Sequence, residues 1–333
     1  MGGTLVVMTT TPHPPDGRPD APPSRRREHL RGLLTGALAA VVGLLPWLAS
    51  GARLPLQNLW ALEVLPDDMP LAALPISQYD ATTILALLVV GAGLAGAVTG
   101  VRRRRSPHAP VALWPVLTGL ALVQLAAVAQ SFVVLASGLG VIPPPASGTS
   151  VLTAVDDRAT LYLAGMLGGT LLCLVLGLAV AALLAHRSSA VVALGVGLVA
   201  VPLASWVVAW PGATAVGGGG LLANAVVRWL PAVAVGLALG WCELRRRSHA
   251  VVWAIDLALL WLVPATLTAL TYAMGMRVLD GDLRDMAAAA AQVFPLVLRE
   301  SARGVMLALA IAVTVILVRR GRLARRGAPE EVR

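Results

Sequence analysis

The chain has 333 residues, of which 57% are hydrophobic and only 13% are charged, and its formal net charge is +9. Soluble domains carry about 25% charged residues, and their apolar stretches are short and periodic. Here the apolar runs reach the ~20 residues that cross about 30 Å of hydrocarbon, and they are apolar on every face. A membrane β-barrel is excluded as well, because barrel strands alternate in segments of about ten residues. The composition therefore predicts an all-α, polytopic transmembrane helical bundle.

The chain begins with a Pro-rich, polar stretch, residues 1–28, which cannot bury a core and is predicted to be a disordered cytoplasmic tail. A transmembrane domain is predicted over 29–319 and a cytoplasmic tail over 320–333. Eight spans are expected, at about 32–52, 81–101, 112–138, 159–185, 190–210, 221–242, 250–274 and 303–318. The first run also resembles a signal peptide, since arginines precede it and the small residues of WLASGA follow it. An uncleaved helix is favoured because seven further spans follow.

Arginine clusters occur at every second connection of this bundle, and all 26 basic residues are arginine. The tails and the turns at 102–111, 186–189 and 243–249 together hold 19 Arg against 6 Asp/Glu, whereas the opposite side holds 7 Arg against 10 Asp/Glu. This alternation is the positive-inside pattern, so both termini are predicted to be cytoplasmic in a cell membrane. Topology explains the basic charge, and no nucleic-acid partner is needed. The lysine-free composition, rich in Ala, Gly and Val, is typical of a high-GC bacterial genome.

Similar sequence motifs recur at the ends of several apolar runs: GLAGAVTGVRRRRS from Gly93, GLAVAALLAHRSS from Gly177 and GLALGWCELRRRS from Gly236. Each places its first Arg or His nine positions after the glycine. We interpret the chain as four tandem helical hairpins, spans 1–2, 3–4, 5–6 and 7–8, as in a duplicated, permease-like bundle. Chance resemblance within a small apolar alphabet is an equally good explanation.

Catalytic motifs are absent from the sequence. A chain without lysine has neither a Walker-A lysine nor a Schiff-base lysine, and it contains no GxSxG elbow and no HExxH pair. The five histidines all fall in predicted cytoplasmic tails or turns, and the two cysteines lack CxxC spacing. We therefore expect no enzyme activity, no cofactor and no metal site.

Five polar residues inside predicted spans form the candidate intramembrane polar site: Asp256, Arg228, Gln124, Gln130 and Asn224. Asp256 is the most costly, because a central Asp costs about 2.5–3.5 kcal/mol in a membrane helix. It is either a proton- or cation-coupling carboxylate or, by preference, a group bonded between helices. About 11 Å of depth separates it from Arg228, so a direct bridge is disfavoured and Arg228 is expected to snorkel to the outer interface. Gln124 and Gln130 are expected to bond across helices, and Asn224 lies one turn before Arg228 on the same face.

Two outer connections carry apolar residues of their own. Residues 53–80 are predicted to fold over the mouth of the bundle, and 276–302 to contain a short interfacial or re-entrant helix. The turn at 211–220 is predicted to be flexible. Close helix packing is indicated by four glycine pairs with GxxxG spacing: Gly32/Gly36, Gly96/Gly100, Gly165/Gly169 and Gly236/Gly240.

These features predict a non-catalytic, multi-pass membrane component, a scaffold, accessory or permease-like protein. Its expected partners are the lipid bilayer and, as one option, another membrane protein. The alternative is a secondary transporter that uses the intramembrane polar residues. Transport predicts that Asp256, Gln124 and Arg228 line one water-accessible cavity, whereas a structural role predicts separate helix contacts.

Overall fold

The computed structural model describes residues 25–54, 68–105, 112–139, 141, 157–211, 219–243, 247–276 and 282–327. The predicted disorder of residues 1–24 and the predicted flexible turn, over 212–218, lie outside this description. The helices within it are α1 (Arg25–Ala49), η2 (Gln78–Asp80), α2 (Ala81–Arg105), α3 (Leu113–Gly138), α4 (Asp157–Leu184), α5 (Ser189–Val208), α6 (Gly219–Cys242), α7 (Arg247–Gly275) and α8 (Leu283–Gly327).

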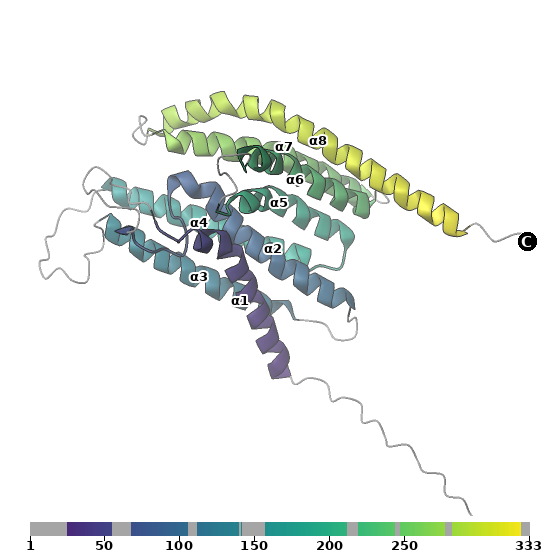
Figure 1. Ribbon diagram of the computed structural model, residues 1–333, viewed down its shortest axis with the longest axis horizontal. Coiled ribbons are helices and arrows are strands. Elements are labelled where there is room, and N and C mark those ends of the chain that lie inside the picture. Colours follow the sequence, from purple (N-terminus) through teal and green to yellow (C-terminus); the bar gives the residue numbers. More distant parts are fainter. Residues whose placement is uncertain are drawn as a thin grey trace, which may run out of the picture.

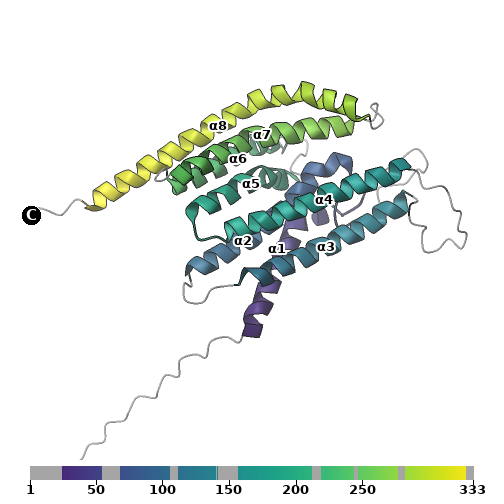
Figure 2. The same cartoon turned by 180° about the vertical axis from the view of Figure 1, so that it is seen from behind.

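The eight α-helices in this part of the chain are each long and apolar enough to cross a membrane. The prediction of an eight-span helical bundle is therefore confirmed. Figures 1 and 2 show most of the helices lying roughly along one common direction, whereas α1 crosses its neighbours steeply. The end that carries Arg102–Arg105 is called the basic end, and the opposite end, at which residues 68–80 lie, is called the loop end.

Packing divides the bundle into two similar halves. In the first half, α1 packs against α2 and α3, and α2 packs against α4. In the second half, α5 packs against α6 and α7, and α6 packs against α8. The halves meet chiefly through α2 and α5. In each half the first helix therefore contacts the second and the third, and the second contacts the fourth.

The hairpin interpretation is correct for only some pairs. Helices α1–α2, α5–α6 and α7–α8 lie side by side along much of their length, but α3 and α4 pack only weakly against each other. The reason is that α3 is held by α1 and α4 is held by α2 through close backbone crossings.

Glycines make these crossings possible. A Cβ at Gly36 would clash with the Val116 carbonyl of α3, and one at Gly119 would clash with the backbone of Leu33 in α1. A Cβ at Gly96 would lie 2.7 Å from the Cα of Ala181 in α4. In lipid, where apolar burial does not drive helix association, such close van der Waals contact is a main source of stability.

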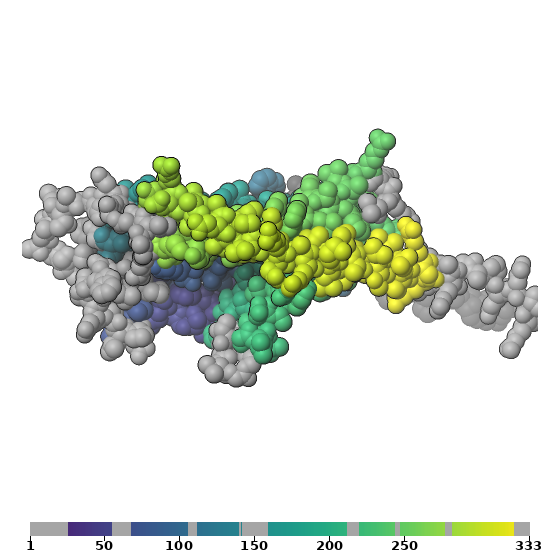
Figure 3. Space-filling model, turned by 90° about the horizontal axis from the view of Figure 1, so that it is seen from above, coloured from purple at the N-terminus to yellow at the C-terminus, as the bar shows by residue number. Residues whose placement is uncertain are grey.

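Helix α8 differs from prediction. An interfacial helix within 276–302 followed by a span at 303–318 was expected, but one helix of 45 residues runs through both. The strong helix formers at 287–291, all alanine, extend the helix outward, and Pro295 is accommodated inside it. At 1.5 Å per residue α8 is about 67 Å long, more than twice the hydrocarbon thickness. Figure 3 shows it running across one whole face of the molecule.

Both predicted tails are also partly helical, since α1 starts at Arg25 and α8 ends at Gly327. At the basic end, arginines bind carbonyls that end neighbouring helices. Arg103 donates to the Ala185 carbonyl after α4 (3.3 Å), and Arg319 donates to the carbonyls of Gly240 (3.2 Å) and Trp241 (3.1 Å) in the last turn of α6. A cation at a helix C-terminus is favourable because the last carbonyls lack helical partners.

Candidate functional site

Asp256 lies in the α5–α7 interface, and its exposed fraction is 0%. A Cβ at Gly197 of α5 would clash with Oδ1 of the carboxyl group, so the carboxyl group occupies the space that the missing side chain leaves. Neither carboxyl oxygen has a hydrogen-bond partner among the residues described. The interhelical hydrogen bond or ion pair that the sequence favours for Asp256 is therefore not found among the described residues. The group instead packs against the α5 backbone.

The surroundings of Asp256 are otherwise apolar. Trp253, one turn earlier on α7, is 7% exposed, and its indole N–H also lacks a partner within the described residues. Leu260, one turn later, is 4% exposed. A buried polar group without a hydrogen bond costs about 1–3 kcal/mol in protein mutational data. Asp256 is therefore a local source of instability.

Gln124 has the role expected of it. Its side-chain nitrogen donates to the Leu88 carbonyl of α2 at 2.8 Å, and the residue is 1% exposed. The contact ties α3 to α2 within the first half of the bundle. Its Oε1 has no partner in the described chain. Gln124 therefore bonds across helices.

Gln130 forms hydrogen bonds with the backbone of a loop rather than with a neighbouring helix. Its Oε1 accepts from the Ala73 N–H (2.8 Å) and its Nε2 donates to the Leu71 carbonyl (2.9 Å), while the neighbouring Ser131 hydroxyl accepts from the Leu74 N–H (2.8 Å). Leu74 and Ile76 of this loop are fully buried in a cluster with α1, α2 and α3. Residues 72–77 of the predicted cap are thus inserted into the loop end of the first half.

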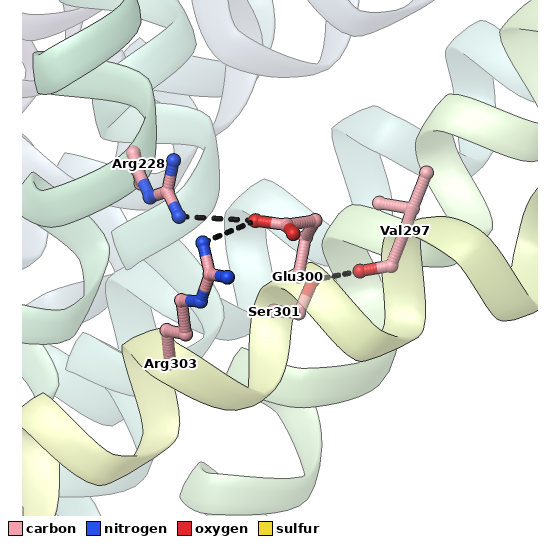
Figure 4. Close-up of polar contacts among 5 residues, drawn as sticks. All are labelled: Arg228, Val297, Glu300, Ser301 and Arg303. Atoms are coloured by element: carbon pink, nitrogen blue, oxygen red, sulfur yellow. Dashed lines mark hydrogen bonds and ion pairs between the residues drawn. The ribbon is translucent and has the colours of Figure 1, made fainter.

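Arg228 pairs with an acidic residue that lies outside the predicted spans. Its guanidinium lies 3.0 Å from Glu300 of α8, and Arg303 reaches the same carboxylate oxygen at 3.1 Å (Figure 4). The Arg228 guanidinium also lies 5.0 Å from the ring centre of Trp229. Both side chains are partly uncovered by the described chain, at 37% and 58% exposed. A direct bridge to Asp256, disfavoured on depth, does not form.

Asn224 is exposed on α6 one turn before Arg228. The five candidates thus fall into separate places: the α5–α7 interface, the α2–α3 interface, the loop insertion and the α6–α8 surface. The structure does not bring Asp256, Gln124 and Arg228 to one cavity.

A cavity of about 370 Å³ exists elsewhere, between α2, α5, α6 and α7. It lies at the loop end, since it reaches the first turn of α2 and the last turn of α5. The lining contains none of the five candidates and no charged side chain. The lining residues are Thr82, Thr83, Val201, Ala204, Ser205, Val208, Ala209, Val227, Pro231, Pro264, Leu267 and Thr268.

Helix α4 carries an unused packing surface. The pairs Gly96/Gly100 and Gly236/Gly240 meet α4 and α8 closely, and Gly32/Gly36 meets α3. By contrast, a Cβ at Gly165, Gly168 or Gly169 would meet nothing within 4 Å in the described chain. Among the residues described, no three His, Cys, Asp or Glu side chains come together to hold a metal ion.

The fold and its apolar helices define the class of protein, a multi-pass helical membrane protein. Comparison with known proteins adds no narrower assignment. No family model, no curated protein and no solved structure matches the chain.

Three features could not be found from the sequence alone. Gly197 is one of 33 glycines, and nothing in its local sequence marks it as the residue opposite Asp256. Glu300 falls in a predicted outer connection, so the sequence does not mark it as a partner for Arg228. The cavity hydroxyls belong to several helices, and such a grouping depends on tertiary packing that one sequence does not reveal.

Proposed function

We propose that this multi-pass membrane protein is a non-catalytic membrane component that acts by lateral assembly with a second copy of itself. The single observation that carries the proposal is the unused glycine surface of α4. Three of the four GxxxG pairs are in contact with another helix of the chain, and Gly165/Gly169 is not, within the described residues. Small residues let helix backbones approach closely in lipid, so such a surface favours a partner helix.

Burial along α4 supports the same surface. In the stretch 159–169 no residue is buried, and the first buried one is Thr170, at 2% exposed. Leu161 and Leu172, at 75% and 69% exposed, flank the glycines as large side chains that a partner could cover. Tyr162, Leu163 and Met166 pack against the core of the first half, so the outer half of α4 keeps one face on the bundle and leaves its glycine face uncovered by the described chain.

A second copy is the proposed occupant because the surface is self-complementary. Residues 159–184 of α4 contain no charged side chain, so two such helices meet without repulsion. A two-fold axis along the membrane normal would place Gly168 of one copy at the depth of Gly168 of the other. Closed two-fold pairs are the commonest homo-oligomers.

The arginine pattern supports a cell-membrane orientation with both termini in the cytoplasm. Secondary transport, the alternative, has weaker support. It requires intramembrane polar groups on one path, whereas Asp256, Gln124 and Arg228 belong to different contacts. The cavity has no ionisable group in its lining.

Cysteine cross-linking in native membranes tests the assembly. In a Cys173→Ala, Cys242→Ala background, Gly168→Cys is expected to give a cross-linked dimer on mild oxidation. Gly220→Cys is the matched control, because Gly220 also has no neighbour within 4 Å but lies on α6. Equal cross-linking at both positions would indicate random collision, and no cross-linking at Gly168 would refute the second copy as occupant.

A further inference from the structure

Hydroxyl groups in these helices normally bond within their own helix. Each of five threonines donates to the carbonyl four residues earlier, at 2.7–2.9 Å: Thr99, Thr118, Thr170, Thr266 and Thr314. This local bond satisfies a hydroxyl group in lipid. The threonines that line the cavity are compared with this bonding pattern.

Three threonines of the cavity make no such bond. Thr268, two residues after Thr266 on α7, has no hydrogen bond within the described residues, and the same holds for Thr82 and Thr83 in the first turn of α2. Ser205 makes only a long bond to the Val201 carbonyl, at 3.4 Å. The cavity thus brings together hydroxyl groups from three helices that remain available to a ligand.

The rest of the lining is apolar. Val227 and Pro231 from α6 and Pro264 and Leu267 from α7 form much of the wall. A volume of about 370 Å³ is near the lower end of the range for small-molecule pockets, and a few polar groups in an apolar wall are typical of them. Because no charged side chain lines the cavity, an ion or a charged metabolite would lose its hydration without compensation. The ligand chemistry is therefore neutral, with oxygen atoms at one end and hydrocarbon at the other.

The position of the cavity indicates that its neutral ligand is a lipid. Thr82 is the second residue of α2 and Val208 is the last of α5, so the cavity lies where helices reach the membrane boundary. The glycerol and ester oxygens of lipids lie at this depth, next to the start of their acyl chains. Asn224, one turn outward from Val227 and on a similar face of α6, adds a polar group near the rim.

We propose that the cavity between α2, α5, α6 and α7 binds the neutral glycerol-ester part of a membrane lipid. The threonine hydroxyls donate to its ester oxygens, and the apolar wall holds the first part of an acyl chain. This site is independent of the α4 surface, because the two share no residue. The same chemistry occurs in a free acylglycerol and in the backbone of a phospholipid.

Ligand-induced thermal stabilisation tests the site on the full-length, delipidated protein in detergent. Monoolein is expected to raise the unfolding temperature in a saturable way. Thr268→Val should raise the half-saturating concentration about 3- to 10-fold, because one hydrogen bond contributes roughly 1 kcal/mol. Thr266→Val is the matched control on the same helix and should leave it unchanged, since that hydroxyl already bonds the Leu262 carbonyl.

A second variant tests the same cavity by a different change, so that the conclusion does not depend on the folding of one variant. Ala209→Phe, at the end of α5, places a large ring in the cavity and should abolish saturation by monoolein. Phosphatidylglycerol in place of monoolein distinguishes the sources: saturation by both identifies a phospholipid backbone as a natural ligand, and saturation by monoolein alone identifies a free acylglycerol. Saturation by dodecane as strong as by monoolein, equal effects of the two threonine variants, or no saturable response would overturn the proposal.

Discussion

The contact between Gly197 and Asp256 allows a double-mutant test of the α5–α7 interface. In Gly197→Ala the new methyl group would overlap the carboxyl group, whose Cγ lies 2.8 Å from an ideal Cβ position. Overpacking of this kind costs about 1–3 kcal/mol. Asp256→Ala removes the group that is overlapped and also a buried carboxyl group without a partner, so its own effect is expected to be within about 1 kcal/mol of zero.

The double variant should therefore be at least as stable as Asp256→Ala alone. The methyl group introduced at position 197 would occupy part of the vacated space, and the Gly→Ala change favours the helix by up to about 1 kcal/mol. The coupling free energy is expected to be about 1–3 kcal/mol, as for residues in direct contact. Thermal unfolding in detergent, followed by helicity, would show it as a shift of several degrees, at ~2 °C per kcal/mol.

The control pairs Asp256→Ala with Gly220→Ala, whose methyl group meets nothing within 4 Å, and the two effects should add. If Gly197→Ala destabilises the protein equally with and without the Asp256 carboxyl group, the contact does not limit the approach of α5 and α7. The packing explanation for this buried acid would then be refuted.

Three further predictions concern the loop, the crossings and the topology. Gln130→Ala should expose the 71–74 segment to protease and cost about 1–3 kcal/mol, whereas Ser137→Ala, which loses only a bond to its own helix, should not. Gly96→Ala should destabilise the folded chain by about 1–3 kcal/mol, but Gly220→Ala should leave thermal stability unchanged or slightly raised. A tag inserted after Gly217 should be accessible only from outside the cell; accessibility from the cytoplasm would reverse the proposed orientation.

The number and places of the spans could be predicted because hydrocarbon thickness sets a length that single helices must meet. The residues at which the helices begin and end were less predictable. Arg25–Arg27 continue α1 into the basic end, and the helix that contains Pro295 continues through a predicted break. Propensity and a proline were insufficient guides there, because helix formation beyond the apolar core depends on neighbours. Helix α8 has α6 and α7 beside it.

The polar residues were identified correctly as unusual, but their partners were not predictable. Gln124 and Gln130 each bond a backbone group, and a backbone acceptor leaves no trace in the sequence. Arg228 was compared with the only acid inside a predicted span, whereas its partner Glu300 lies at the edge of one. The depth of Asp256 in the membrane makes it an unsuitable partner for Arg228, but depth alone does not point to Glu300.

The two halves of the bundle differ at one equivalent crossing, and that difference bears on both Asp256 and the cavity. In the first half, glycines of α1 and α3 meet backbone directly, so the two helices approach closely along their contact. In the second half, Gly197 of α5 meets the Asp256 carboxyl group, and α5 and α7 pack together less extensively than α1 and α3 do. The cavity opens between the same two helices, one turn beyond Gly197 at Val201 and two turns beyond Asp256 at Pro264. The Asp256 carboxyl group therefore lies between α5 and α7 on the basic-end side of the cavity.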